Sequence, residues 1–256
     1  MNDTTRRLEG GPLSPHRRTG FSLHGDMFGP KPMYFACAFY GDGMPKKDIT
    51  VTISAADRLL ETTTNPRHRQ ILENYRRHAI LEVCGYWQPI FEPNMTVEHP
   101  IYYYNVRGFA GDKAEGAAAI KGIYQHLAES SGSVMIVQNE RLMISDWGFA
   151  SEAEFHSYYR GYTLIGDGIP VDNPDGFYIL RQGYVMLWNY DDRARMIGEQ
   201  VYENRSLYEL KEIPEDDFLT LEDARAQLMP LLRPLPIYDP ITNTQSPGHE
   251  TFQVAA

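Results

Sequence analysis

The sequence predicts an α+β domain in which helices come first along the chain and a mainly antiparallel sheet follows. The first observation is that apolar residues recur with the helical period of 3.6, above all over residues 66–84. The second is that the period changes to two from about residue 133, where four long strand candidates follow one another between turn signals. Helices followed by an antiparallel meander are typical of α+β folds.

The longest predicted helix begins at Pro66, a residue type favoured at the first helical position, with Asn65 as its N-cap. It ends before Gly85, which suits the left-handed conformation that often follows a helix. Tyr75 and His78 lie on its apolar stripe, so we expect both side chains to face the interior.

The remaining elements follow in order. A helix start is expected at residues 54–57, a short helix over 85–93, a strand over 95–100, a tyrosine-rich loop, and a second long helix over 112–128. The strand candidates are 133–144, 152–166, 176–191 and 193–204, and a late helix falls within 214–233. We therefore divide the chain into an N-terminal extension or arm (1–64), a main domain (65–212), and a C-terminal helix with a proline-rich tail (213–256).

Composition excludes several classes of protein. The net charge of −10 argues against nucleic acid or an anionic membrane as the main partner, because both would repel the chain. No apolar run reaches the roughly 18 residues of a membrane span, and no apolar segment of the secretory type follows the N-terminal arginines. We therefore expect a cytoplasmic protein. Cys37 and Cys84 do not make a disulfide framework or a zinc motif, and buried thiols are expected.

Motifs for nucleotides, activated serine or zinc are missing from the sequence, and its histidines show no close metal-ligand spacing. We therefore expect no cofactor. With 17 Tyr, 11 Phe and 3 Trp, a ligand cavity would be lined by aromatic side chains. Such a cavity suits a small aromatic substrate.

Three stretches carry a family resemblance. Residues 96–100 (TVEHP) are followed by a predicted helix whose residues 116–124 read GAAAIKGIY. Residues 188–202 resemble the last β-hairpin of the same family. Ketosteroid isomerases carry a similar Thr-Val-Glu-Asp-Pro and then Gly-x-x-Ala-Ile-x-x-Phe-Tyr. Over residues 66–212 the chain thus resembles the NTF2-like superfamily, which includes SnoaL-like polyketide cyclases. The resemblance implies a cone in which helices pack on a strongly bent antiparallel or mixed sheet. It does not account for residues 1–64 and 213–256, which we interpret as N- and C-terminal extensions.

The resemblance also implies two catalytic residues. His99 stands where the isomerases hold their general-base carboxylate, and His78 falls near the position of their tyrosine oxyanion donor. Imidazole titrates near neutral pH, so two histidines in one cavity would serve as acid and base. The alternatives are a histidine at a strand end and a histidine at the edge of the core.

The strand candidate 152–166 places His156, Tyr158, Arg160 and Tyr162 on one face and Phe155 with its alternating neighbours on the other. We interpret the first face as a pocket wall, on which Arg160 would hold a phenolate; the alternative is a polar exterior.

In the tyrosine-rich loop, Tyr103 is the preferred phenolic donor. Asp146 is either a carboxylate partner or a turn cap. The predicted substrate-binding residues are Tyr75, Tyr102, Tyr104, Asp146, Trp147, His156, Tyr158 and Trp188.

More narrowly, the length, the N-terminal segment and the aromatic-rich segments resemble the sphingomonad lignin-dimer lyases. This implies deformylation of a 1,2-diarylpropane-1,3-diol through a quinone methide, without a cofactor. A SnoaL-like cyclase, a dehydratase, an isomerase and a non-catalytic binding or assembly module remain as alternatives. A homodimer or homotrimer is expected, because sheets of this superfamily often pair through their outer faces.

Overall fold

The computed structural model describes residues 47–107, 111–130, 132–249 and 252. They belong to one compact unit, residues 45–256. The apolar run at 34–40 and Cys37, both singled out in the sequence, lie outside the described residues.

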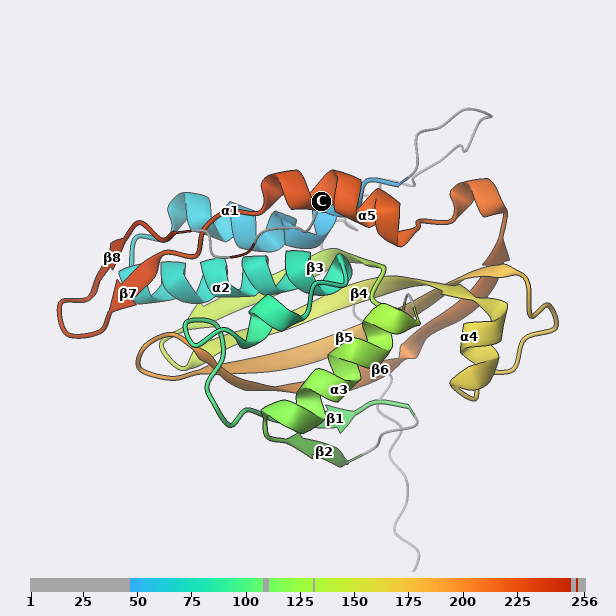
Figure 1. Ribbon diagram of the computed structural model, residues 1–256, viewed down its shortest axis with the longest axis horizontal. Coiled ribbons are helices and arrows are strands. Elements are labelled where there is room, and N and C mark those ends of the chain that lie inside the picture. The colour runs from blue at the N-terminus through green and yellow to red at the C-terminus, as the bar shows by residue number, and fades with distance from the viewer. Residues whose placement is uncertain (1–46, 108–110, 131, 250–251, 253–256) are drawn as a thin grey trace, which may run out of the picture. The chain divides into compact units, whose positions relative to one another are not determined.

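A six-stranded sheet forms the base of the unit, in the order β2-β1-β6-β5-β4-β3 (Figure 1). Its strands are β1 (Ile101–Asn105), β2 (Asp112–Glu115), β3 (Met135–Ser145), β4 (Gly148–Arg160), β5 (Phe177–Tyr190) and β6 (Met196–Ile213). All neighbours are antiparallel except β1 and β6, which are parallel, so the sheet is mixed. A separate hairpin pairs β7 (Ile237–Asp239) with β8 (Thr244–Ser246).

Helices cover one face of this curved sheet. Figure 1 shows α2 (Pro66–Val83) directly above the strands, with α1 (Ser54–Thr62) and α5 (Leu221–Leu228) beyond it. The other helices are α3 (Ala117–Glu129) and α4 (Gly161–Gly166), with short 3₁₀ turns η1 (Ile49–Ile53), η2 (Gln88–Phe91), η3 (Glu215–Asp217) and η4 (Met229–Leu231). The predicted α+β class, with helices packed on a bent mixed sheet, is therefore confirmed. None of the described helices is long and apolar enough to cross a membrane.

The long helix α2 follows its sequence signals closely. The Asn65 side chain accepts hydrogen bonds from the backbone of Arg67 and His68, which satisfies two donors of the first turn. Gly85 adopts a φ of 71° just beyond the C-terminal end, a conformation that costs glycine little. The start and the end of this helix were both predicted correctly.

Several other boundaries differ from the prediction. The tyrosine-rich segment predicted as a loop is β1, which lies between β2 and β6, while residues 95–100 make only a single bridge, from Thr96 to Met196. Residues 112–115 are β2 rather than helix, because Gly116, with φ of 83°, separates the strand from α3. The strand 152–166 ends at Arg160, since the backbone N–H groups of Gly161 and Tyr162 bond to the loop carbonyls of Gly176 and Pro174.

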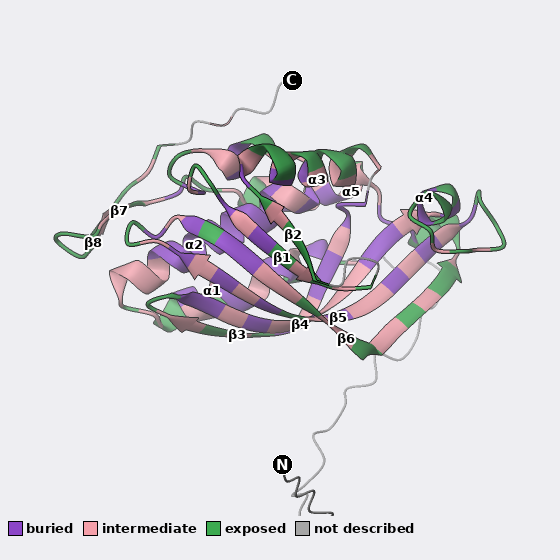
Figure 2. Ribbon diagram, turned by 90° about the horizontal axis from the view of Figure 1, so that it is seen from below, coloured by how far each residue is buried: buried purple, intermediate pink, exposed green. Residues whose placement is uncertain are grey.

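Two clusters of buried apolar residues hold the helices on the sheet. Figure 2 shows buried stretches on both the helices and the strands. One cluster centres on Tyr75, Phe149 and Trp188. The other includes Ile49 and Ile53 of η1 together with Leu219 and Leu228 at the C-terminal side. Residues 49–62 and α5 therefore contribute to the same core as the predicted main domain.

Candidate active site

A cavity of about 160 Å³ lies between α2 and the inner face of the sheet. Its walls carry three aromatic rings (Tyr75, Phe155 and Trp188) and three ionisable groups (His78, Glu82 and Glu199). The other lining side chains are aliphatic or small, apart from Thr52 and two methionines, Met135 and Met186. The site is thus an aromatic pocket with a few polar groups, the usual make-up of a small-molecule site.

His78 is the buried histidine of this cavity. It lies one turn before Glu82 on α2, and its Nε2 is 3.4 Å from Glu82 Oε2. The same nitrogen is 2.8 Å from the hydroxyl of Tyr124 on α3. The Trp188 ring packs edge-on against the imidazole at 4.8 Å between ring centroids, which holds its orientation.

The hydrogen bonding continues from Tyr124 into the sheet. The Tyr124 hydroxyl is 3.3 Å from that of Tyr102 on β1, and both side chains are buried. Burial raises the pKa of each hydroxyl well above its usual value, so both stay neutral and can donate or accept a hydrogen bond. A chain of three groups, His78–Tyr124–Tyr102, therefore runs beside the cavity.

Glu199 stands on the opposite wall, on β6. Burial, and secondarily the charge of Glu82, raises the pKa of the Glu199 carboxyl to about 8. The preceding residue, Gly198, allows β1 to approach closely, because a Cβ there would lie 1.8 Å from the Ile101 carbonyl oxygen. The glycine thus lets β6 carry Glu199 into a tightly packed wall.

A second buried carboxyl lies behind the Tyr75 ring. The Tyr75 hydroxyl donates a 2.7 Å hydrogen bond to Glu140 Oε1. Burial raises the pKa of Glu140 to about 7, although the hydrogen bond from Tyr75 acts in the other direction. The register of β3 shifts between Gln138 and Arg141, and this irregularity accompanies the burial of Glu140.

The structure brings part of the predicted site together. Tyr75, His78 and Trp188 line the cavity, and Tyr102 joins it through Tyr124. Tyr104 lies beside Tyr102, with 6.3 Å between the ring centroids. These predicted residues form one continuous group.

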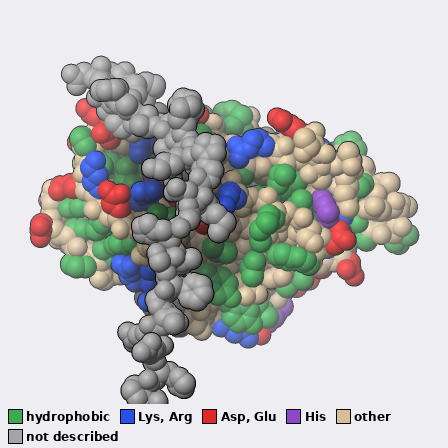
Figure 3. Space-filling model, turned by 180° about the vertical axis from the view of Figure 1, so that it is seen from behind, with side chains coloured by type: hydrophobic (Ala, Val, Ile, Leu, Met, Phe, Trp, Pro, Cys, Tyr) green, Lys and Arg blue, Asp and Glu red, His purple; other side chains and the backbone are tan. Residues whose placement is uncertain are grey.

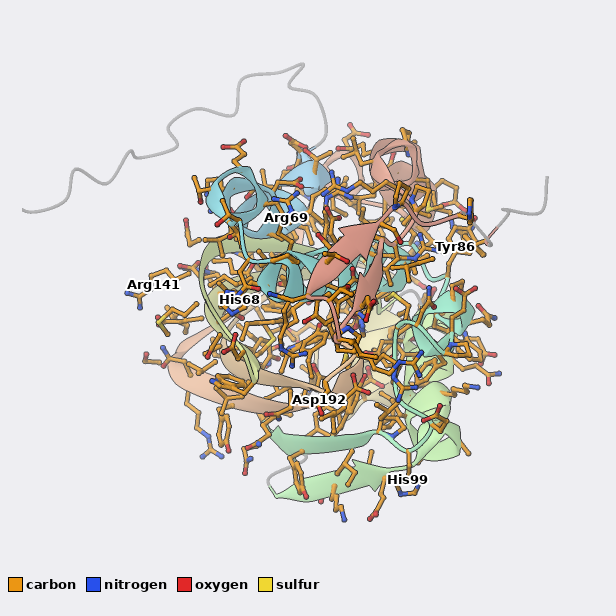
Figure 4. The ribbon with its side chains drawn as sticks, turned by 90° about the vertical axis from the view of Figure 1, so that its left-hand side faces the viewer. His68, Arg69, Tyr86, His99, Arg141 and Asp192 are labelled. Carbon is orange, nitrogen blue, oxygen red and sulfur yellow. The ribbon has the colours of Figure 1, made fainter. Side chains whose placement is uncertain are left out.

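The structure does not bring the two predicted histidines together. The His99 side chain is 68% exposed and pairs with Glu115 on β2, 3.3 Å away. Figure 4 shows it at the β1–β2 edge. Tyr103 is 40% exposed, because alternation along β1 turns it away from the side that holds Tyr102. The expectation that His99 and Tyr103 share the cavity of His78 is therefore wrong.

The pocket face of β4 was also assigned wrongly. Phe155 lines the cavity. Successive side chains of a strand point to opposite faces, so His156 and Tyr158 lie on the face of β4 away from the cavity. His156 bonds to Gln138, and Tyr158 belongs to the other apolar cluster. Arg160, at the end of the strand, packs over the Phe177 ring at 4.1 Å and donates to the Asp175 carbonyl.

Asp146 and Trp147 form the turn between β3 and β4. The Asp146 side chain is 81% exposed and lies 2.7 Å from His68 Nε2, and Trp147 is 45% exposed. A role at the turn, the alternative for Asp146, describes its surroundings better than a place in the cavity. Figure 4 shows His68 on the helical side, apart from His99.

Glu199, Glu82, Glu140 and Tyr124 were not assigned roles from the sequence. The i,i+4 spacing of His78 and Glu82 was a visible signal for their pairing. Nothing local distinguishes Glu199, since its burial depends on β1 and α2, which are distant in sequence. Within the described residues no group of three or more His, Cys, Asp and Glu side chains is placed to hold a metal ion.

No protein-family model matches the chain, and no curated protein matches it. Among solved structures, an NTF2-like protein from Anabaena variabilis is 12% identical with a TM-score of 0.41, over 56% of this chain and 93% of that one. A polyketide-cyclase-like protein from Xanthomonas campestris is 14% identical (TM-score 0.41; 55% and 94% covered). A SnoaL-like protein from Jannaschia is also 14% identical (TM-score 0.41; 57% and 92%). At this level of similarity no activity or substrate carries over.

Proposed function

We propose that the chain is a lyase that needs no cofactor and acts by acid–base chemistry in the cavity beside His78. Its proposed substrate is a phenolic 1,2-diarylpropane-1,3-diol, which would release formaldehyde and leave a stilbene. The observation that carries the proposal is a buried imidazole bonded to Tyr124 inside an aromatic cavity, with Glu82 and Glu199 on facing walls. Groups that exchange protons at neutral pH are what this reaction needs.

The reaction divides into two parts. First the benzylic hydroxyl leaves as water, assisted by a general acid, while the phenol loses its proton and becomes a quinone methide. A base then removes the proton of the primary alcohol, the adjacent carbon–carbon bond breaks, and formaldehyde departs. The electron pair of that bond restores the aromatic ring, so no electrons enter or leave overall.

The cavity volume favours a second candidate. A cavity of about 150 Å³ accommodates a benzene ring, and this one measures about 160 Å³. A cyclase, dehydratase or isomerase of the SnoaL type, acting on a substrate with one ring, would fit entirely inside. The diaryl substrate would place one ring in the cavity and the rest beyond it.

The deciding experiment incubates the purified protein with a phenolic diarylpropane diol and measures formaldehyde and stilbene absorbance. The matched control substrate carries a methyl ether in place of the phenol, which blocks the quinone methide. We expect product from the phenol alone. Dehydration without formaldehyde would favour the second candidate, and binding without turnover of either substrate would contradict an enzymatic role.

A further inference from the structure

Two carboxyl groups face the same apolar cavity from opposite walls, Glu82 from α2 and Glu199 from β6. No lysine or arginine is among the described residues that line it. Among the described residues, neither a hydrogen bond nor an ion pair holds the Glu199 carboxyl. Glu82 has His78 beside it, whereas Glu199 has no such partner. Two negative charges in one desolvated space would repel each other, so the group without a partner keeps a proton.

We propose that Glu199 holds this proton and donates it to the oxygen that leaves the substrate, with His78 as the base on the other wall. The inference rests on the proposed function and extends it by naming the acid. Glu199 lines the cavity, so a bound substrate would touch it.

Surroundings decide which carboxyl is protonated. Glu82 is the more exposed of the two, with 20% of its side chain accessible, and it lies 3.4 Å from His78 Nε2, within reach of a hydrogen-bond partner. Glu199 is buried among neutral hydroxyls, and burial raises its pKa to about 8. The titratable groups that face it are Glu82 and His78 on α2, Tyr102 and Tyr104 on β1, Tyr124 on α3 and Tyr190 on β5.

The proposed proton transfers return both residues to their starting protonation states. In the first step Glu199 gives its proton to the benzylic hydroxyl, the carbon–oxygen bond breaks toward oxygen, and water leaves. The phenol passes its proton to His78 as the quinone methide forms. In the second step the Glu199 carboxylate takes the proton of the primary alcohol while formaldehyde departs. His78 returns its proton to the phenolate of the stilbene, and both residues regain their starting states.

Glu199→Gln tests the proposal, because the amide keeps the shape of the side chain and removes the acid. Glu209→Gln is the matched control, since Glu209 lies on the same strand with its side chain 61% exposed. We expect Glu199→Gln to lower kcat by about a hundredfold or more with stilbene binding retained, and the control to match the wild type. Full activity of Glu199→Gln would overturn the assignment, and so would lost stilbene binding with unchanged kcat.

A second measurement does not depend on turnover. Carboxyl ¹³C NMR of the labelled full chain should show one glutamate that titrates near pH 8 and disappears in Glu199→Gln but not in Glu209→Gln. If no glutamate that titrates above about pH 6 is lost with Glu199, the proposal fails. If the wild type releases no formaldehyde from any phenolic diol, the proposed function fails instead, and the titration alone decides whether Glu199 holds the proton.

Discussion

His78 and Tyr124 lie 2.8 Å apart, between imidazole Nε2 and phenolic oxygen, and this contact joins α2 to α3. Both side chains are buried. The contact also fixes which part of the imidazole borders the cavity, since a ring held at one nitrogen and packed edge-on against Trp188 has little freedom to turn.

Replacing His78 should remove the proposed base. We expect His78→Gln to lower kcat by about 10²–10⁴-fold, equivalent to about 3–5 kcal/mol, in the formaldehyde assay. His126→Gln is the control, because His126 lies on α3 with its side chain 66% exposed. His99→Gln should also retain activity, since His99 lies outside the cavity. A folded His78→Gln protein with normal kcat would disprove the role.

Tyr124→Phe should distinguish the positioning of the His78 ring from the proton transfer proposed for His78. The change removes the hydrogen bonds to both His78 and Tyr102 while keeping the ring. Leaving buried polar groups without a partner costs about 1–3 kcal/mol, so the free energy of unfolding should fall by that amount in urea titrations. Tyr124→Phe is expected to lower kcat less than His78→Gln does. Unchanged stability would contradict the buried contact.

The Glu140 carboxyl predicts how stability depends on pH. Its pKa rises on folding from an ordinary 4.5 to about 7, so the folded state holds a proton that the unfolded state has released. Stability from this group is complete below about pH 4.5 and is lost as pH rises to about 7. At 1.36 kcal/mol per pKa unit, the loss is of the order of 3 kcal/mol.

Urea unfolding at several pH values checks this expectation. Glu140→Gln should make the decline between about pH 5 and 7 shallower, because the amide resembles the protonated acid and still accepts from Tyr75. The Glu199 carboxyl, with its pKa raised to about 8, still contributes to the remaining decline. Glu152→Gln, on the neighbouring strand with its side chain 43% exposed, serves as the control. Parallel curves for the wild type and Glu140→Gln would show that Glu140 does not titrate in this range.

Two glycine-to-alanine variants should change stability in opposite directions. At Gly198 a Cβ would lie 1.8 Å from the Ile101 carbonyl oxygen, so Gly198→Ala must push β1 away from β6. Gly122, in the middle of α3, has nothing within 4 Å of an added Cβ. We expect Gly122→Ala to stabilise by about 0.5–1 kcal/mol and Gly198→Ala to destabilise by more than that, in thermal unfolding. The same sign for both would refute the close approach.

The outer face of the sheet predicts association. Val185 on β5 is paired with Tyr202 on β6, and Tyr103 on β1 is paired with Gln200, two residues earlier on the same face of β6. The three apolar side chains are each about 40% exposed, and Figure 3 shows hydrophobic side chains gathered on one face of the molecule. We expect light scattering to report a dimer or trimer of the 29.3 kDa chain. Tyr202→Glu, which places a charge in the apolar surface, should lower the measured mass toward that of the monomer. A wild-type monomer at micromolar concentration would exclude this.

The sequence predicted the layers of the fold well because local signals determine them. Asn65, Pro66 and Gly85 define α2, and the alternation after residue 133 defines the meander. The site was harder to predict. Which face of β4 lines the cavity depends on the helix packed against it, so Phe155 was placed on the wrong side. The place of Glu199 in the cavity could not be predicted, because it depends on β6 lying opposite α2.

The parallel pairing of β1 with β6 has a consequence for synthesis. Roughly a hundred residues separate Tyr103 from its partner Gln200, and β6 lies between β1 and β5. The nascent chain therefore exposes α2 and its apolar stripe long before the strand that carries Glu199 leaves the ribosome. At about 5–20 residues per second, the unfinished cavity stays open for roughly 5–20 s, accessible to chaperones and to other nascent chains. The arrival of β6 both joins β1 to the sheet and adds the wall of the cavity that carries Glu199, so an unfinished chain has the helices without the complete cavity.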